Sequence, residues 1–326
     1  MSTDTKEKTL VVIQLTGGND FMNTVVPYNN EHYYDARKKI VISQNDVLPI
    51  NDTLAINNNA RPLKRLFDEG KVAIVQGIGY PNSNRSHFRG MDIWHTCEPD
   101  RVGSEGWLGL AIKDLDPKGE NVLTGVNIGQ GLPRAMSVAG VPITSVGDLE
   151  GYGVMNKIEQ ERLKERSLQA FKDIYGQAIG SGQVAEYIGK TGLDVLKGAD
   201  LLANVANQYK SSVEYADNSI AKSLRDVARV HFANLGTRVF YTNHGGYDTH
   251  ANEMPAHPKL LSDLSGAISD FMDDLKEHDA ADDVAILVFT EFGRRMRDNG
   301  SGTDHGSGGG AFLIGNNVKG GLYSEY

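Results

Sequence analysis

Short, almost entirely apolar runs recur along the chain, and each ends in glycine or in polar residues. Runs of about four to eight such residues, bounded by turn formers, are typical of buried strands. The pattern predicts strands at Leu10–Leu15, Val72–Val75, Thr237–Thr242, Val284–Phe289 and Ala311–Gly315. Because strands that alternate with helical segments are typical of α/β folds, we expect a mostly parallel sheet.

Helical periodicity separates several of these runs. Apolar residues at helical spacing predict a short helix over Asn59–Gly70 and a longer one over Pro258–His278. The longer helix leads from the strand Thr237–Thr242 into the strand Val284–Phe289. This order predicts a strand–helix–strand unit with a right-handed crossover.

The middle of the chain, at about 151–233, changes character because it is rich in Glu, Lys, Arg, Leu and Ala. Its apolar residues recur at roughly helical spacing and predict helices at Lys157–Tyr175, Val184–Ala206 and Ala216–Phe232. We interpret this segment as a structural helical insertion. The whole chain, 1–326, is expected to form a single α/β domain that contains it.

Composition narrows the class of function. Hydrophobic residues make up 40% of the 326 residues and charged residues 23%, which is typical of a soluble globular protein. The net charge of −9 argues against nucleic-acid binding, which favours a basic surface, but a few local arginines can still hold a small anion. Cys97 is the only cysteine, so a disulfide within the chain and a thiolate metal cluster are both excluded.

The sequence also bears on the compartment. No apolar run approaches the roughly 20 residues that cross a bilayer, so we expect no membrane span. The first residues, MSTDTKEKTLVV, lack the apolar core of a secretory signal. As written, the sequence predicts a cytoplasmic protein; the alternative is a mature protein whose leader has been removed.

Ionisable residues follow the first two predicted strands. Asp20 comes after Leu10–Leu15 and two glycines, where it either serves a site at the carboxyl end of the strand or forms an Asx turn. A polar cluster follows Val72–Val75 and comprises Arg85, Ser86, His87 and Arg89. Arginines on both sides of a serine suit an oxyanion such as phosphate or sulfate. The alternative is a solvated loop in which Ser86 caps the following helix.

Ionisable residues also lie beside the later strands. In chain order they are Asp248, His250, Glu291, Arg294, Asp304 and His305. Asp248 and His250 are two residues apart, so both could reach one metal from an extended or turned loop. Because the carboxyl ends of parallel strands meet at one edge of a sheet, a shared site along that edge is the better explanation for so many polar loops.

The donor types at these positions narrow the choice of cation. Carboxylates and imidazoles without thiolate suit Mg²⁺, Mn²⁺, Ca²⁺ or Zn²⁺. A serine activated by such a metal can attack phosphate or sulfate esters while arginines hold the remaining oxygens. The glycine signature of dinucleotide-binding strands and the Walker motif are both absent, which argues against nucleotide sites of those kinds. We therefore expect a small anionic ester as the substrate.

Five stretches of the chain carry a family resemblance: LTGGNDFMNTVVP, NRSHF, GGYDTHANE, FTEFGRRMRDNGSGTDHG and VKGGLY. Together they resemble the bacterial sulfatase-like family called domain of unknown function 1501. The resemblance implies the alkaline phosphatase and sulfatase superfamily, and hence a doubly wound, mostly parallel sheet with metals at its carboxyl edge. It also implies export, to the periplasm or beyond, through a twin-arginine leader. Since the family usually continues beyond VKGGLY, we expect the chain to be truncated at its C-terminus.

The resemblance implies roles for individual residues as well. Metal ligands of the superfamily fall at Asp20, Asp248, His250 and His305, and its nucleophile falls near Ser86. The chain departs from its hydrolytic relatives at Glu291-Phe292, where those proteins have an Asp-His pair.

Two functions from different classes stay open. The first is a metal-dependent hydrolase of phosphate or sulfate esters with Ser86 as nucleophile. Its expected metal ligands are Asp20, Asp248, His250, Glu291, Asp304 and His305, and its expected substrate-binding residues are Arg85, His87, Arg89 and Arg294. The second is a non-catalytic, degenerate sulfatase-like binding protein with at most one metal, which the departure at Glu291-Phe292 favours. A structural, partner-binding protein is a third possibility and would require an exposed apolar patch.

Overall fold

The computed structural model describes residues 7–149, 160–179, 182–202 and 205–326. The chain forms two compact units, both discontinuous in sequence. Unit 1 comprises Met1–Gly103, Ser211–Arg225 and Tyr241–Tyr326, and unit 2 comprises Ser104–Lys210 and Asp226–Phe240.

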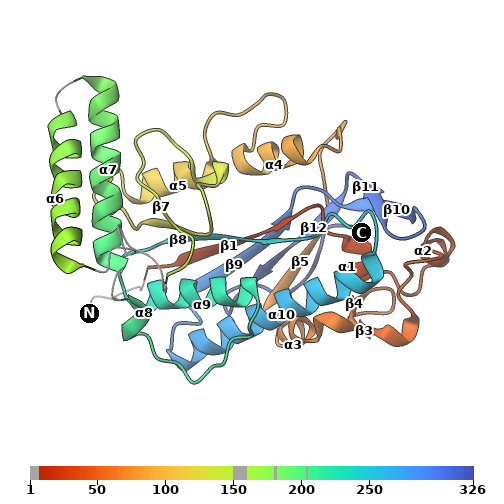
Figure 1. The fold of residues 1–326 in the computed structure, drawn as a ribbon. Helices are drawn as coiled ribbons and strands as arrows, with labels where there is room; N and C mark the ends of the chain where they lie inside the picture. Colours follow the sequence, from red (N-terminus) through yellow and green to blue (C-terminus); the bar gives the residue numbers. More distant parts are fainter. Residues whose placement is uncertain (1–6, 150–159, 180–181, 203–204) are drawn as a thin grey trace, which may run out of the picture. The chain divides into compact units, whose positions relative to one another are not determined.

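A sheet forms the centre of unit 1 (Figure 1). Its strands are β1 (Thr9–Thr16), β5 (Val72–Ile78), β8 (Val239–Gly245, which enters unit 1 at Tyr241), β9 (Val284–Thr290), β12 (Gly309–Ile314) and β13 (Gly321–Tyr323). They lie in the order β13-β5-β12-β9-β1-β8. β1 pairs parallel with β9, and β5 with β13, whereas β12 is antiparallel to both of its neighbours. The fold is therefore mixed α/β with a mostly parallel central sheet, as the hydrophobic pattern predicts.

Smaller elements surround this sheet. The helices of unit 1 are α1 (Phe21–Thr24), α2 (Glu31–Ala36), α3 (Arg61–Asp68), α4 (His87–Thr96) and α10 (Glu253–Glu277), with 3-10 turns at Gln44–Asp46 and Asn58–Ala60. A second, antiparallel sheet has the order β2-β4-β3, from β2 (Val25–Val26), β3 (Val47–Pro49) and β4 (Ala55–Asn57). β10 (Arg294–Asp298) and β11 (Thr303–His305) form an antiparallel hairpin between β9 and β12 in the chain.

Adjacent residues of β9 identify the helices that cover the two faces of the central sheet. Phe289 stacks on Trp94 of α4, with ring centroids 4.6 Å apart. Val288 points to the opposite face, because side chains alternate along a strand, and shares a small internal cavity with Leu261 of α10. α3 packs beside α10 on that face (Figure 1). Helices on both faces bury the middle of the strands, so the polar loops at the strand ends are where ligands can reach the sheet.

Unit 2 combines a short strand pair with several helices. Its elements are α5 (Trp107–Leu115), β6 (Gly125–Ile128), a 3-10 turn at Arg134–Met136, β7 (Thr144–Val146), α6 (Glu161–Ala178), α7 (Gln183–Leu202) and α8 (Val205–Gln208). β6 and β7 pair in parallel, and α6 and α7 lie side by side as a helical hairpin (Figure 1). α9 (Ser219–Phe232) begins in unit 1 and ends in unit 2.

Helices α6 to α9 fall in the segment for which the sequence predicts a helical insertion. The start of that segment, at about 151, lies outside the described residues, as does Lys157, the predicted first residue of its first helix. The organisation of the chain as a single domain with an insertion stays a prediction.

The start of α10 differs from the prediction, which places it at Pro258. Proline is favoured in the first turn of a helix, so the pattern favours a start there. In the structure the helix begins at Glu253, because tertiary contacts hold an earlier turn. The backbone N–H of Glu253 donates to the carbonyl of Ser301 over 3.0 Å, and the side chains of Glu253 and His257 are buried. The extra turn thus brings two ionisable side chains into the interior of unit 1.

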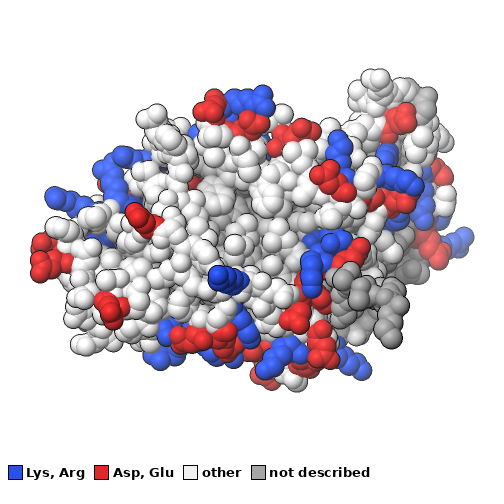
Figure 2. All heavy atoms as spheres, turned by 180° about the vertical axis from the view of Figure 1, so that it is seen from behind, with Lys and Arg blue, Asp and Glu red and all other residues white. Residues whose placement is uncertain are grey.

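The surface gives two further observations. None of the described helices has both the length and the apolar character needed to cross a membrane. On the face shown in Figure 2, acidic and basic side chains are interspersed around a broad uncharged area. Among the described residues of that face, no basic stripe of the kind that nucleic-acid-binding proteins present is visible.

Candidate metal centre

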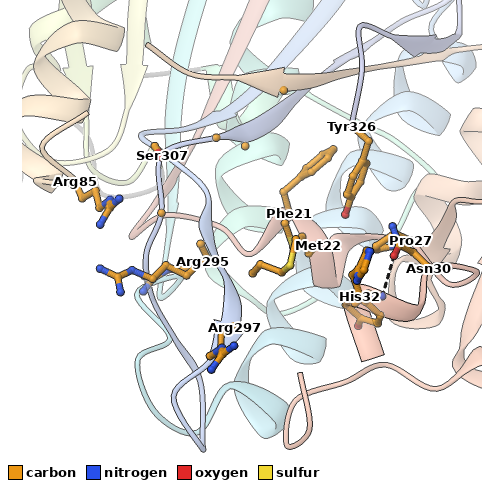
Figure 3. Close-up of a pocket in the computed structure, with 17 residues that line it drawn as sticks. Phe21, Met22, Pro27, Asn30, His32, Arg85, Arg295, Arg297, Ser307 and Tyr326 are labelled. Carbon is orange, nitrogen blue, oxygen red and sulfur yellow. Dashed lines mark hydrogen bonds between the residues drawn. The ribbon is translucent and has the colours of Figure 1, made fainter. Parts of the chain in front are cut away.

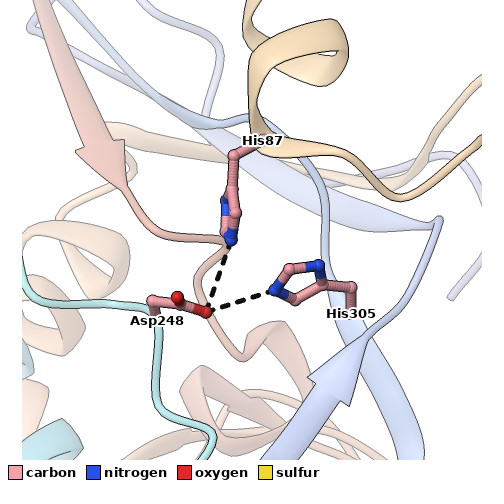
Figure 4. Close-up of side chains that lie close together, drawn as sticks. All are labelled: His87, Asp248 and His305. Carbon is pink, nitrogen blue, oxygen red and sulfur yellow. Dashed lines mark hydrogen bonds and ion pairs between the residues drawn. The ribbon is translucent and has the colours of Figure 1, made fainter.

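His87, Asp248 and His305 come together in unit 1 from three separate elements (Figure 4). His87 is the first residue of α4, Asp248 lies in the loop after β8, and His305 ends β11. One nitrogen or oxygen atom from each side chain lies within 4.8 Å of those of the other two. Because the Asp248 side chain is 49% exposed, a small ligand can reach the cluster from solvent.

Glu291 binds Nδ1 of His87, so Nε2 is the nitrogen of this imidazole that faces the cluster. Nδ1 of His87 lies 2.7 Å from Oε1 of Glu291, and the same oxygen accepts the backbone N–H of Gly17 over 2.9 Å. Because this carboxylate oxygen accepts hydrogen bonds, the nitrogen of His87 that faces it must donate one. Nδ1 of His87 therefore carries a proton. In the neutral imidazole of His87, Nε2 then presents a lone pair, 3.4 Å from Oδ1 of Asp248.

His305 has the same arrangement with a different partner. Its Nδ1 lies 2.8 Å from the main-chain carbonyl of Arg85, which can only accept, so Nδ1 carries the proton. Its Nε2 presents a lone pair 3.3 Å from Oδ1 of Asp248. A third imidazole, that of His250, stands beside the cluster, with Nε2 at 3.1 Å from Asp248 Oδ1 and 2.8 Å from His305 Nε2.

These groups fit a divalent cation. Two imidazole lone pairs and one carboxylate converge, and acceptors repel one another unless a positive charge lies between them. Nε2 of His87 is buried and has no hydrogen-bond partner among the described residues, and in the neutral imidazole its contact with Asp248 joins two acceptors. Two imidazoles and one carboxylate are a donor set typical of Zn²⁺ and also suit Mn²⁺. His87, Asp248 and His305 would hold the cation, and the neighbouring His250 could add a further nitrogen.

Arg294 holds Asp248 in place. Its guanidinium is fully buried and donates to Oδ1 of Asp248 over 2.6 Å. It also donates to four main-chain carbonyls, those of Gly17, Gly18, Tyr247 and Thr303. Burial opposes the ionisation of Asp248, but the hydrogen bond and charge of Arg294 outweigh it and hold the pKa of that carboxyl below its usual value. Asp248 is thus ionised at neutral pH, as a metal ligand must be.

The predicted site residues divide into those at the cluster and those behind it. Asp248, His250 and His305 lie together, and Asp304 contacts Nδ1 of His250 at 3.5 Å. Glu291, also expected as a ligand, lies behind His87 and orients it. Arg294, expected to bind substrate, has protein partners for its Nε and for both terminal nitrogens. The roles predicted for these residues stay predictions.

The polar cluster after β5 is dispersed. Ser86 is the N-cap residue of α4, as the alternative interpretation has it, but its hydroxyl makes no capping hydrogen bond. Arg85 is exposed, with its carbonyl on His305. Arg89 is paired with Asp92 and donates to main-chain carbonyls beyond α4, so its guanidinium is already engaged by the protein.

Asp20 lies in a buried network away from the cluster. Both of its oxygens accept from the guanidinium of Arg37. Although burial favours the neutral acid, Arg37 holds the pKa of Asp20 at about 2. Burial and the charge of Asp20 raise the pKa of the neighbouring Glu253 to about 9, so Glu253 keeps its proton at neutral pH. His257 is also neutral there, because burial lowers its pKa to about 4.

Phe292 lies beside the imidazoles of His87 and His305. Its ring centroid lies 4.8 Å from that of His87 and 4.9 Å from that of His305. A side chain at position 18 would collide with it, since a Cβ on Gly18 would lie 2.6 Å from the Phe292 ring. A hydrocarbon ring thus covers one side of both imidazoles.

His87 lies in the cluster, whereas the sequence predicts a substrate-binding role for it. The available signal is its position in the loop region after a buried strand, the same signal that marks Asp248. The neighbouring arginines and serine obscure this signal, because they favour the prediction of an anion site.

Comparisons with known proteins give a family and several similar folds. The model of the family described as "Protein of unknown function (DUF1501)" matches residues 79–325. No curated protein matches the chain.

Solved structures with a similar fold have low sequence identity to the chain. A protein in the alkaline phosphatase superfamily from Vibrio parahaemolyticus is 11% identical, with a TM-score of 0.41, over 98% of this chain and 62% of that one. The alkaline phosphatase from the Antarctic bacterium TAB5 is 11% identical, with a TM-score of 0.40, over 98% and 95%. The C-terminal periplasmic domain of EcEptC from Escherichia coli, in complex with Zn, is 8% identical, with a TM-score of 0.42, over 96% and 74%. Similarity at this level supports no inference about activity.

The cluster predicts one cation per chain. Purified protein incubated with Zn²⁺ or Mn²⁺ and then desalted is expected to hold about one equivalent, and Asp248→Asn is expected to hold almost none. Glu291→Gln keeps an acceptor for His87 but loses the charge, so its affinity should fall roughly 10- to 100-fold. Elemental analysis and titration calorimetry measure both effects.

The control for metal binding is Asp114→Asn, which changes an exposed aspartate in unit 2. It should bind the cation as the wild type does. Circular dichroism checks that each variant is folded. Undiminished binding by folded Asp248→Asn would contradict the assignment.

The buried acid pair predicts a pH dependence of stability. Folded Glu253 keeps its proton up to about pH 9, whereas the ordinary value for the unfolded chain is 4.5. Over that interval the folded state binds the extra proton, so stability falls as the pH rises. Glu253→Gln mimics the protonated acid, and its melting temperature should exceed that of the wild type increasingly from pH 6 to pH 9.

Glu105→Gln, at an exposed position, is the matched control and should follow the wild type at every pH. Melting curves by circular dichroism give the comparison. Parallel curves for the wild type and Glu253→Gln would show that Glu253 is ionised in the folded protein.

Proposed function

The chain belongs to the DUF1501 family, and we propose that it is a divalent-metal-dependent hydrolase of small phosphate or sulfate esters. The observation that carries the proposal is the convergence of the lone pairs of His87 and His305 on the ionised Asp248, at an edge that solvent can reach. Three protein ligands with an open side are typical of catalytic rather than structural metal sites.

A divalent cation bound there would supply Lewis-acid chemistry towards an ester oxygen. The protein's own residues set the geometry. Glu291 and the carbonyl of Arg85 hold the two imidazoles by their Nδ1–H groups. Arg294 fixes Asp248, and Phe292 excludes water from one side of both rings. The site would therefore meet a substrate without rearranging, which lowers the cost of reaching the transition state.

Ser86 is the candidate nucleophile in this proposal. It precedes His87 directly, and its hydroxyl is not used for capping α4. The first N–H groups of a helix have no partner within the helix, and this favours a bound anion at its start. In the reaction, Oγ of Ser86 forms a bond to phosphorus or sulfur as the bond to the alcohol oxygen breaks and the alcohol leaves with a proton. Water then hydrolyses the serine ester and releases phosphate or sulfate.

A second function, binding without turnover, has one specific observation in its favour. Asp20 is bound to Arg37 and Phe292 lies beside both imidazoles, so neither position supplies a donor for a second cation. A protein with one cation and no nucleophile would bind an anion and release it unchanged.

Ser86→Ala tests the hydrolase. Turnover of 4-nitrophenyl phosphate or 4-nitrophenyl sulfate by the metal-loaded wild type should fall by roughly 100-fold or more in this variant, because the nucleophile is removed. Metal content should stay unchanged, since Ser86 is not among the proposed ligands.

Ser104→Ala, at an exposed serine of unit 2, is the matched control and should keep full activity. Turnover that persists in Ser86→Ala would remove the serine from the mechanism. A metal-loaded wild type that turns over neither ester but binds phosphate would favour the binding protein.

A further inference from the structure

A cavity of about 750 Å³ adjoins the metal centre within unit 1 (Figure 3). Its size falls in the range of small-molecule sites, which is about 300–1,000 Å³. His305 connects the two: its Nδ1 donates to the carbonyl of Arg85, and its own carbonyl lies 3.3 Å from Nε of Arg295. Arg85, Arg295 and Gly306 all line the cavity.

The charge of the cavity lining is opposite to that of the protein. The chain carries a net charge of −9, yet the described residues of the lining include four arginines and no aspartate or glutamate. Arg294 is occupied by its carbonyls and Asp248, but Arg85, Arg295 and Arg297 are exposed. Within the described residues, the guanidinium groups of Arg85 and Arg297 make no hydrogen bond or ion pair, and Arg295 uses only Nε. Their free donors suit a carboxylate, phosphate or sulfate.

The opposite side of the cavity is apolar and aromatic. Phe21, Met22 and Tyr326 lie there, across from the three arginines (Figure 3). Phe21 and Tyr326 are in contact, with ring centroids 5.7 Å apart, and the Tyr326 hydroxyl donates to the carbonyl of Val25. An aromatic wall that faces cationic groups suits a molecule with an apolar body and an anionic group.

The arginines stand on a supported strand. Arg295 and Arg297 both lie on β10, and both line the cavity. The buried Arg37 holds this strand, since it donates to the carbonyls of Arg295 and Met296. The cationic side is therefore fixed before any ligand arrives, which reduces the entropy lost on binding.

We propose that this cavity binds the organic part of the ester and that this part carries a second anionic group, held by Arg295 and Arg297. The inference rests on the proposed function, which assigns the first anionic group, the ester itself, to the metal centre. The substrate class is then a doubly anionic ester with an apolar, aromatic-sized body. An ester of the same size that lacks the second anionic group offers Arg295 and Arg297 no anion to bind.

Three probes that cannot be hydrolysed test the second anion. They are phenylphosphonate, 4-carboxyphenylphosphonate and the longer 4′-carboxybiphenylphosphonate. Calorimetry on the metal-loaded full chain should show at least one carboxylated probe binding about tenfold or more tightly than phenylphosphonate, because charge-assisted hydrogen bonds are strong. The preference should shrink as salt is added, since exposed charges are screened.

Arg295→Ala/Arg297→Ala should remove this preference and leave phenylphosphonate binding within about twofold, because the metal centre is intact. Arg61→Ala/Arg101→Ala changes the net charge equally at exposed positions away from the cavity and should keep the preference. Equal affinity for all probes, or a preference that survives Arg295→Ala/Arg297→Ala, overturns the proposal.

The outcomes separate this inference from the proposed function. A preference for the carboxylated probes without ester turnover supports the cavity assignment and contradicts the hydrolase. Turnover of simple aryl esters without any preference supports the hydrolase and contradicts the second anion site.

Discussion

One buried guanidinium, that of Arg294, holds together several of the loops at the candidate metal centre. It donates to the carboxylate of Asp248 and to the carbonyls of Gly17, Gly18, Tyr247 and Thr303. These acceptors follow β1, follow β8 and lie in β11. A buried cation is costly when its donors lack partners, so displacing any one of these loops destabilises the others through the same charge. Two of the three ligands of the proposed cation, Asp248 and His305, thus lie on segments that Arg294 holds.

Two glycines allow the loop after β1 to approach so closely. Gly17 has a φ of +124°, and a Cβ there would lie 2.3 Å from the backbone nitrogen of Asp248. Gly18 has a φ of +78° and faces the ring of Phe292. Side chains at either position would push the carbonyls away from Arg294. The glycines therefore contribute to the metal centre through the backbone contacts that they permit, without any chemistry of their own.

Much of the fold follows from the sequence, whereas the site follows only in part. The apolar runs predict β1, β5, β9 and β12 because strands buried on both faces need continuous apolar residues. Spacing also places polar residues at the strand ends, and Asp248 and His305 do lie together. Sequence alone does not assign Asp20 to Arg37, since that pairing depends on a helix without a distinctive pattern. Nor does it show that Glu291 supports His87, because a carboxylate that orients a ligand and one that binds a cation look alike in a sequence.

Arg85 belongs to the metal centre through its backbone and to the cavity through its side chain. Its carbonyl accepts the Nδ1 proton of His305, while its guanidinium lines the cavity, and its φ of +56° is a left-handed conformation that L side chains rarely adopt. A ligand that shifts Arg85 therefore shifts the acceptor that sets the basicity of His305. By thermodynamic reciprocity, the ligand and the cation change each other's affinity for the protein by the same factor. If the proposed cation and the proposed ligand both bind, this single peptide unit couples their affinities.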